Sequence, residues 1–129
     1  MPKKEMEFFD VGRIPWKRVV GVVGVKEKVL SRDPESGSYT RILKLERGAE
    51  IPQLLQHDFW EEVYIIKGSL TDKRKKRTFT KGMYACRPPG MKHGPYVSKS
   101  GFLGVEMRYY PERYQRYLQT ARHNSAKRD

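Results

Sequence analysis

A proline- and glycine-rich turn that leads to a histidine constrains this chain more than any other stretch. A short apolar run that begins at Gly82 leads into Pro88, Pro89 and Gly90, and His93 follows. Because proline cannot donate to a sheet ladder, we expect a strand to end at Pro88, and Gly90 lets the backbone turn sharply. The pattern predicts that His93 opens the next strand, where a stiff turn would fix it as a ligand. The alternative is an ordinary Pro-Gly turn with an incidental histidine.

A second histidine stands upstream with a carboxylate, inside an apolar and aromatic strand. His57 precedes Glu61 by four residues, and Gly68 is expected to close the strand. On an extended chain, positions 57 and 61 share parity and face the same side. The two stretches together therefore favour a ligand site over an incidental histidine.

Short alternating segments with turn formers between them make up most of the chain. Residues 25–30 and 39–46 alternate as half-buried strands, and residues 31–38 are dense in turn formers. The charged run 72–77 has no apolar face, so we expect a solvated hairpin tip rather than a contact with a polyanion. Pro111 and the glutamate after it start a helix to Arg122, beyond which we expect a frayed end. The pattern predicts an all-β domain, with sandwich and barrel both open.

The two histidine stretches resemble the two motifs of the cupin superfamily. Gly82, Pro88, Gly90 and His93 match the second motif at every position, and the first motif has its six-residue spacing between Glu61 and Gly68. Among cupins, the chain is similar to the small single-domain group related to anti-sigma-factor cupins and acetylacetone-cleaving-type dioxygenases. The resemblance implies a double-stranded β-helix (jelly-roll barrel) over residues 25–110. Residues 1–24 would then form an arm and first strand, and residues 111–129 a short C-terminal helix and basic tail.

The resemblance also implies a divalent metal, which common cupins hold with three histidines and one glutamate. Carried over to this sequence, Glu61 and His93 match two of these ligands, and His57 matches a third if the spacer has three residues. The remaining histidine position then falls on Leu55, which cannot bind metal. With a four-residue spacer the histidine pair would fall on Leu54 and Gln56, leaving His57 outside the pattern.

The implied ligand set is therefore incomplete by one histidine. His57, Glu61 and His93 form a set that suits iron(II) or zinc, with nickel or manganese as other candidates, and Gln56 or Gln53 would add a weak amide ligand. The alternative is a barrel that retained hydrogen-bonded polar residues and lost its metal.

Strand parity predicts the neighbours of this site. Phe59, Val63 and Ile65 share parity with Glu61 and are expected inside, whereas Trp60 should point away. On the later strands we expect the inward residues to be Tyr84, Cys86, Met107 and Tyr109, with Arg87 on the other side. Such an apolar interior would suit a small, poorly charged organic ligand, with Cys86 as a buried structural thiol.

Composition limits the partners and the compartment. The 129 residues fit one domain, and the net charge of +12 is explained by solubility more simply than by an acidic partner. One cysteine excludes an intrachain disulfide framework and fits a reducing compartment. Because neither a membrane span nor a signal peptide is evident, a cytoplasmic location is the default expectation.

Three classes of function follow. The first is a metal-dependent dioxygenase acting on a diketone-like or aromatic compound, and the second is a sensory cupin that binds a ligand or metal without turnover. The third, a specific nucleic-acid-binding module, ranks last, because no recognition helix or stacking platform is evident. A metal-independent isomerase with His93 as base is a further possibility. We also expect a homodimer, since the arm carries Phe8, Phe9 and Trp16.

Overall fold

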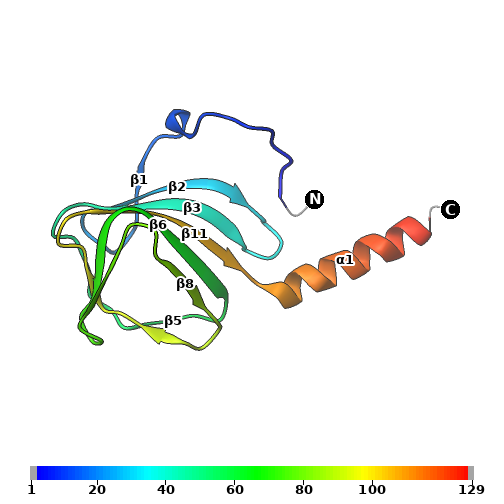
Figure 1. Cartoon of the computed structure of the whole chain (residues 1–129). Helices are drawn as coiled ribbons and strands as arrows, with labels where there is room; N and C mark the ends of the chain where they lie inside the picture. Colours follow the sequence, from blue (N-terminus) through cyan, green and yellow to red (C-terminus); the bar gives the residue numbers. More distant parts are fainter. Residues whose placement is uncertain (1–2, 128–129) are drawn as a thin grey trace.

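The computed structural model describes residues 3–127, and for residues 112–118 it describes the backbone alone. Figure 1 shows a curled antiparallel barrel with an N-terminal arm above it and one helix projecting from its side. The elements along the chain are η1 (Val11–Arg13), β1 (Lys17–Arg18), β2 (Val25–Arg32), β3 (Tyr39–Leu45), β4 (Glu50–Ile51), β5 (Leu55–Gln56), β6 (Trp60–Asp72), β7 (Arg77–Thr80), β8 (Tyr84–Arg87), β9 (Lys92–His93), β10 (Tyr96–Val97), β11 (Phe102–Tyr109) and α1 (Pro111–Ala126).

The main sheet has the order β1-β2-β3-β11-β6-β10-β4, with β7 and β8 also paired to β6 and with β5 and β9 paired separately. This arrangement confirms the expected jelly roll. Strand β6 does not close at Gly68 as expected but continues to Asp72. Gly68 has a φ of +82°, and a side chain there would meet the carbonyl oxygen of Gly101 at 2.0 Å. The glycine therefore lets one strand pair with β11 and β8 before it and with β7 and β10 after it.

The interior of the barrel differs between its two ends. Leu43 and Leu45 of β3 lie opposite Gly104 and Phe102 of β11, within an apolar core. Further along the same two strands, Arg41 lies opposite Glu106, and both side chains are buried. One end of the barrel is thus a hydrocarbon core, and the other is lined with charged groups.

The proline turn forms as the sequence predicts. Strand β8 ends at Arg87, directly before Pro88, and the next strand, β9, consists of Lys92 and His93. Gly90 adopts a φ of +85°, and its N–H donates to the carbonyl oxygen of His57 at 2.7 Å. Strand β9 then pairs with β5, with His93 opposite Leu55. The hydrogen bond from Gly90 and the pairing of β9 with β5 therefore hold the segment around His93 next to the segment around His57.

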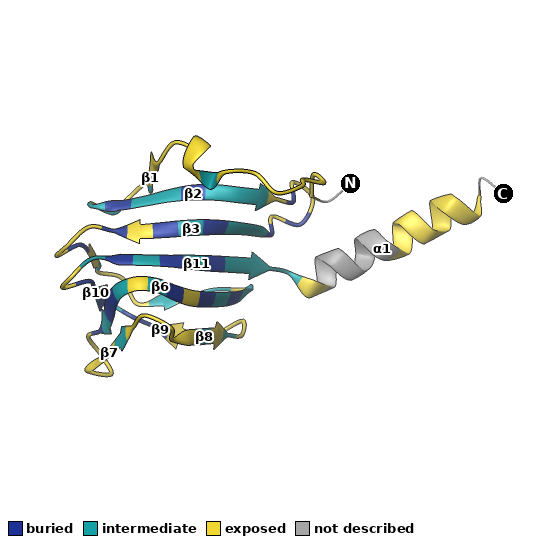
Figure 2. Cartoon of the chain, turned by 45° about the horizontal axis from the view of Figure 1, so that its top comes forward, coloured by how far each residue is buried: buried dark blue, intermediate teal, exposed yellow. Residues whose placement is uncertain are grey.

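The ends of the chain lie outside the barrel. The arm crosses the outer side of β2, where the ammonium group of Lys28 donates to the carbonyl oxygen of Val11 and lies 4.6 Å from the Trp16 ring centroid. Helix α1 extends to Ala126, beyond the predicted end at Arg122, and its described side chains are exposed (Figure 2). Across residues 3–127, no helix has the length and apolar character that crossing a membrane requires.

Candidate metal centre

Two imidazoles and one carboxylate meet at the charged end of the barrel. One potential ligand atom each from His57, Glu61 and His93 lies within 4.8 Å of the other two. The His57 Nε2 atom is 4.0 Å from the nearer Glu61 oxygen, and the two imidazole centroids are 5.1 Å apart. His57 is held in place by stacking on Phe59, with centroids 4.5 Å apart. The sequence-predicted trio is therefore brought together by the fold.

The imidazole nitrogens that face this point have no protein partner. Within the described part of the chain, His57 Nε2 and His93 Nε2 are buried and accept or donate no hydrogen bond. Burial, together with the charge of Arg87, lowers the pKa of His93 to about 3. Burial also lowers the pKa of His57, against the attraction of Glu61. Both rings are thus neutral near physiological pH, which is the form that binds a metal.

Tyr96 orients the ring of His93. The Tyr96 hydroxyl lies 2.9 Å from His93 Nδ1 and also accepts a hydrogen bond from Arg87 at 2.8 Å. A metal at Nε2 requires the tautomer in which Nδ1–H donates to the Tyr96 oxygen. A hydrogen bond of this kind from the far nitrogen is the usual way in which a ligating histidine is held.

Glu61 is engaged by two arginines that the sequence analysis did not place in the site. Arg87 Nη1 donates to one carboxylate oxygen at 2.6 Å, and Arg108 Nε donates to the other at 2.7 Å. Burial alone would raise the pKa of Glu61, but the Arg108 and Arg87 guanidinium groups lower it overall. Glu61 is therefore ionised, and each oxygen keeps a second lone pair for another donor or a metal.

These contacts belong to a longer chain of charges, which we call the ionic network: Glu27, Arg41, Glu106, Arg108, Glu61 and Arg87. Arg41 donates to Glu27 at 2.6 Å and to Glu106 at 2.7 Å. The Glu106 carboxylate oxygen Oε2 in turn lies 3.7 Å from Nη2 of Arg108. Acids and guanidinium groups alternate along the network in equal number, so its net charge is zero. The barrel thus buries several charges with each one paired, as burial of ions requires.

Two predicted positions near the histidines differ in where they face. Gln56 is exposed, and its side-chain nitrogen donates to the carbonyl oxygen of Gly90 at 3.1 Å. Leu55 is half-buried, packs against the apolar core and lies directly opposite His93. Directly opposed residues of an antiparallel pair project to the same face. Leu55 therefore stands beside His93, in the place where a further ligand would be expected.

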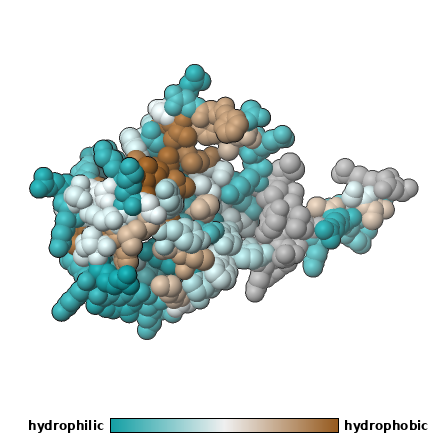
Figure 3. Space-filling view, in the orientation of Figure 1, coloured by the Kyte–Doolittle hydropathy of each residue, from teal (hydrophilic) through white to brown (hydrophobic). Residues whose placement is uncertain are grey.

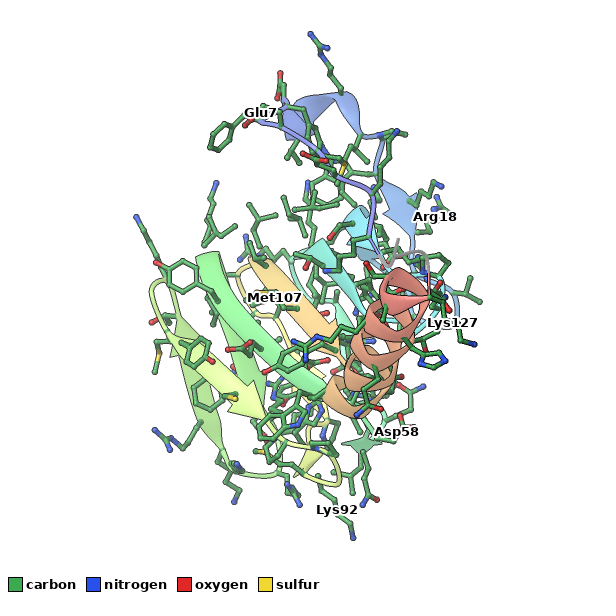
Figure 4. All side chains as sticks on the ribbon, turned by 90° about the vertical axis from the view of Figure 1, so that its right-hand side faces the viewer. Glu7, Arg18, Asp58, Lys92, Met107 and Lys127 are labelled. Carbon is green, nitrogen blue, oxygen red and sulfur yellow. The ribbon has the colours of Figure 1, made fainter. Side chains whose placement is uncertain are left out.

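The inward face of two strands was predicted wrongly. Tyr84 and Cys86 are exposed, while Ala85 and Arg87 are half-buried, and Cys86 is consequently not a buried thiol. On β11, Arg108 lies opposite Glu61, whereas Met107 lies opposite Glu62 and Tyr109 opposite Trp60 on the outer side. Figure 4 shows Met107 on the side of the barrel toward the arm. Apolar residues were assigned inward by default, but here the interior carries the charges.

A cavity adjoins His93, one of the three candidate ligands. It has a volume of about 110 Å³ and is lined by His93, Arg87 and Tyr96 at its buried end. Lys75 and Met83, which also line it, are exposed, so the cavity runs from the surface toward the site. Its walls include Val63 and Ile65, as strand parity predicted.

The residues present fit a divalent metal ion. Three ligand atoms at about 2.1 Å from one ion lie about 3.0–3.6 Å from one another, so atoms within 4.8 Å need to approach by roughly 1–2 Å, which side-chain rotation can supply. Two neutral imidazoles without partners and an ionised carboxylate are suitable donors for such an ion. The cluster suggests a divalent metal site, and it does not specify which metal.

Comparison with known structures shows that the chain has the fold of cupin proteins. An RmlC-like cupin from Shewanella frigidimarina superimposes with a TM-score of 0.67 at 19% identity, covering 84% of this chain and 94% of that one. The polyketide cyclase RemF from Streptomyces resistomycificus gives a TM-score of 0.69 at 16% identity, covering 81% and 80%. An acetylacetone dioxygenase from Acinetobacter johnsonii gives a TM-score of 0.64 at 17% identity, covering 82% and 73%. Likenesses at these identities establish the fold alone.

The family can be stated more closely. Residues 4–107 match the model of the ChrR cupin-like domain, and the chain belongs to this family. No curated protein matches the chain. The family match covers both histidine stretches and two arginines of the ionic network, Arg41 and Arg87, and it ends directly before Arg108.

Proposed function

We propose that this cupin binds one divalent transition metal ion at His57, Glu61 and His93 and uses it to bind a small organic molecule in the adjoining cavity. The observation that supports this most directly is the pair of buried imidazole nitrogens without partners. Leaving a buried polar atom unsatisfied costs free energy, about 1–3 kcal/mol for a typical group. A bound metal ion would accept the lone pairs of both imidazole nitrogens and of the nearby carboxylate, which would explain why the site keeps the two nitrogens unpaired.

Oxygenation of the bound molecule is the reaction we favour. Two histidines and one carboxylate are typical of iron(II) oxygenases, in which the metal supplies the redox chemistry, and similar sets hold zinc. One structural neighbour is an acetylacetone dioxygenase. In this chain, Arg87 and Arg108 would hold Glu61 ionised and in position, and Tyr96 would hold the ring of His93. The apolar cavity wall would limit the entry of water.

A sensory or binding role without turnover is the second candidate. It is favoured by Leu55, which occupies a place beside His93 that would otherwise hold a further ligand. It is also favoured by the pairing of both Glu61 oxygens with guanidinium groups, which weakens a carboxylate as a metal ligand. Release of the metal or ligand, rather than product formation, would then be the signal.

Metal content tests the proposal. Protein purified without chelators and then exposed to iron(II) or zinc should carry close to one equivalent of metal per chain by elemental analysis. His93→Ala and His57→Ala should each lose most of it, because two remaining ligands hold a divalent ion weakly. His123→Ala is the matched control, since it removes an exposed histidine of α1 and should leave metal content unchanged.

The contrary result is equally clear. If the folded wild-type chain takes up none of these metals, or if His123→Ala lowers metal content as much as His93→Ala does, the metal site proposed here is wrong. Circular dichroism would confirm that the site variants remain folded.

A further inference from the structure

The cavity beside the candidate ligands has apolar walls and cationic ends. Its apolar wall is formed by Val63, Ile65, Leu70, Phe79, Met83 and Met91. Arg87 lies at the buried end, and Lys75 is exposed at the other. A site of this kind selects a ligand with a short hydrocarbon part and an acidic group.

The charge balance argues in the same direction. Arg87 and Arg108 already match the charge of Glu61 within the neutral ionic network. The other candidate ligands are neutral imidazoles, so a divalent ion bound there would add two positive charges, of which the one acid among the cavity-lining residues could offset only one. Asp72, the acidic residue among those that line the cavity, is 2% exposed and accepts hydrogen bonds from the backbone N–H groups of Arg74 and Lys75. Its carboxylate is thus committed to the turn.

Arg87 has donors left for a ligand. Its hydrogen bonds to Glu61 and Tyr96 use Nη1 and Nη2, and a guanidinium group carries further N–H donors. A carboxylate beside Arg87 would accept charge-assisted hydrogen bonds and lie next to His93. The apolar interior expected from the sequence suggested a poorly charged ligand, whereas the placement of Arg87 inside the barrel favours an acidic one.

We propose that the cavity binds a small monocarboxylate, with its carboxylate beside Arg87 and His93 and its hydrocarbon part against the apolar wall. This inference deepens the proposed function, since it assigns a ligand class to the same site. Size limits the ligand, because an engineered cavity of about 150 Å³ holds a benzene molecule. The volume here, about 110 Å³, suits an aliphatic acid of a few carbon atoms.

The test compares butanoate with butanamide, which has nearly the same shape and no charge. Binding of each to the full chain is measured by calorimetry at low salt, with and without zinc, and zinc content is determined on the same samples. Butanoate should bind about tenfold more tightly than butanamide, because hydrogen bonds to a charged acceptor are the stronger ones. Equal affinities for the two compounds in the zinc-loaded protein would overturn the inference.

A matched pair of variants separates a local effect from the overall charge of the protein. Arg87→Gln removes a partner of buried Glu61 and risks unfolding, so the exposed lysines are used instead. Lys75→Gln should weaken butanoate binding about threefold, whereas Lys76→Gln, which changes net charge equally outside the cavity lining, should not alter it. Equal losses in the two variants would show attraction to the basic surface alone and overturn the inference. If butanoate is preferred but zinc is not bound, the metal proposal fails while the carboxylate site stands on its own.

Discussion

Leu55 is the residue at which this chain departs from the common cupin ligand set. It pairs with His93 across β5 and β9 and lies on the same face, whereas Gln56 pairs with Lys92 and is exposed. This geometry favours the alignment in which His57 is a ligand and Leu55 takes the place of the missing histidine.

Two substitutions test that alignment. Leu55→His should raise zinc affinity about tenfold or more, because an added imidazole contributes directly at the ion. Gln56→His is the matched control and should leave affinity unchanged, since position 56 faces solvent. Competition against a chelator of known affinity measures both. A larger gain from Gln56→His than from Leu55→His would show that the other alignment is correct.

At the scale of single elements, the sequence predicted the strands better than their orientation. The proline turn, the hairpin tip and most of the strands followed from local chemistry, although β6 continues past Gly68. Period-two alternation shows which residues share a face, but it does not show which face is inside. On β8 and β11 the more apolar set faces outward, so Arg87 and Arg108 were missed. Parity places each arginine on the face opposite to its apolar neighbours, and no further signal in the sequence showed that this face is the inner one.

The turn between β2 and β3 carries a pH-dependent contribution to stability. Asp33 is 3% exposed and accepts hydrogen bonds from the Ser36 hydroxyl and from the backbone N–H of Glu35. Burial alone would raise the pKa of Asp33, but these hydrogen bonds lower it overall. A lowered pKa in the folded state stabilises the protein at pH values above the unfolded pKa of about 4. This stabilisation is lost as the pH falls through the pKa of the folded state.

Asp33→Asn should therefore lower the free energy of unfolding by roughly 1 kcal/mol at neutral pH. The difference from wild type should shrink as the pH falls below about 4, where both proteins lack the charge. Urea unfolding at several pH values measures it. Glu35→Gln, an exposed change in the same turn, should show little effect at any pH. A deficit of Asp33→Asn that persists undiminished in acid would refute the electrostatic account.

At the scale of the whole molecule, the outer side of the barrel carries several apolar side chains, with Glu62 and Lys67 between them. Apolar side chains on this side come from β11 and β6, and we call them the outer face: Leu103, Val105, Met107, Tyr109, Trp60 and Tyr64. They alternate along both strands with the residues that face the interior. Figure 3 shows hydrophobic residues gathered on the side of the barrel below the arm. The arm adds Phe8, which is fully exposed at 100%, and Phe9 at 44%. An apolar surface of this kind is typical of an interface between subunits.

A homodimer formed through the outer face therefore stays our prediction. Light scattering at micromolar concentration should give twice the chain mass. Val105→Lys, in the middle of the outer face, should shift the protein toward monomer, because a buried unpaired charge is costly at an interface. Gln53→Lys, which adds the same charge to an exposed loop, should not. A monomeric wild type under these conditions would contradict the prediction.

The claim on which the account depends is that His57, Glu61 and His93 hold one metal ion. Anomalous scattering from crystals of the zinc-loaded full chain tests it directly. We predict one strong peak about 2.0–2.2 Å from His57 Nε2, His93 Nε2 and a Glu61 oxygen. No peak at that position, with Arg87 and Arg108 still paired to Glu61 and zinc only at the surface, would contradict the account.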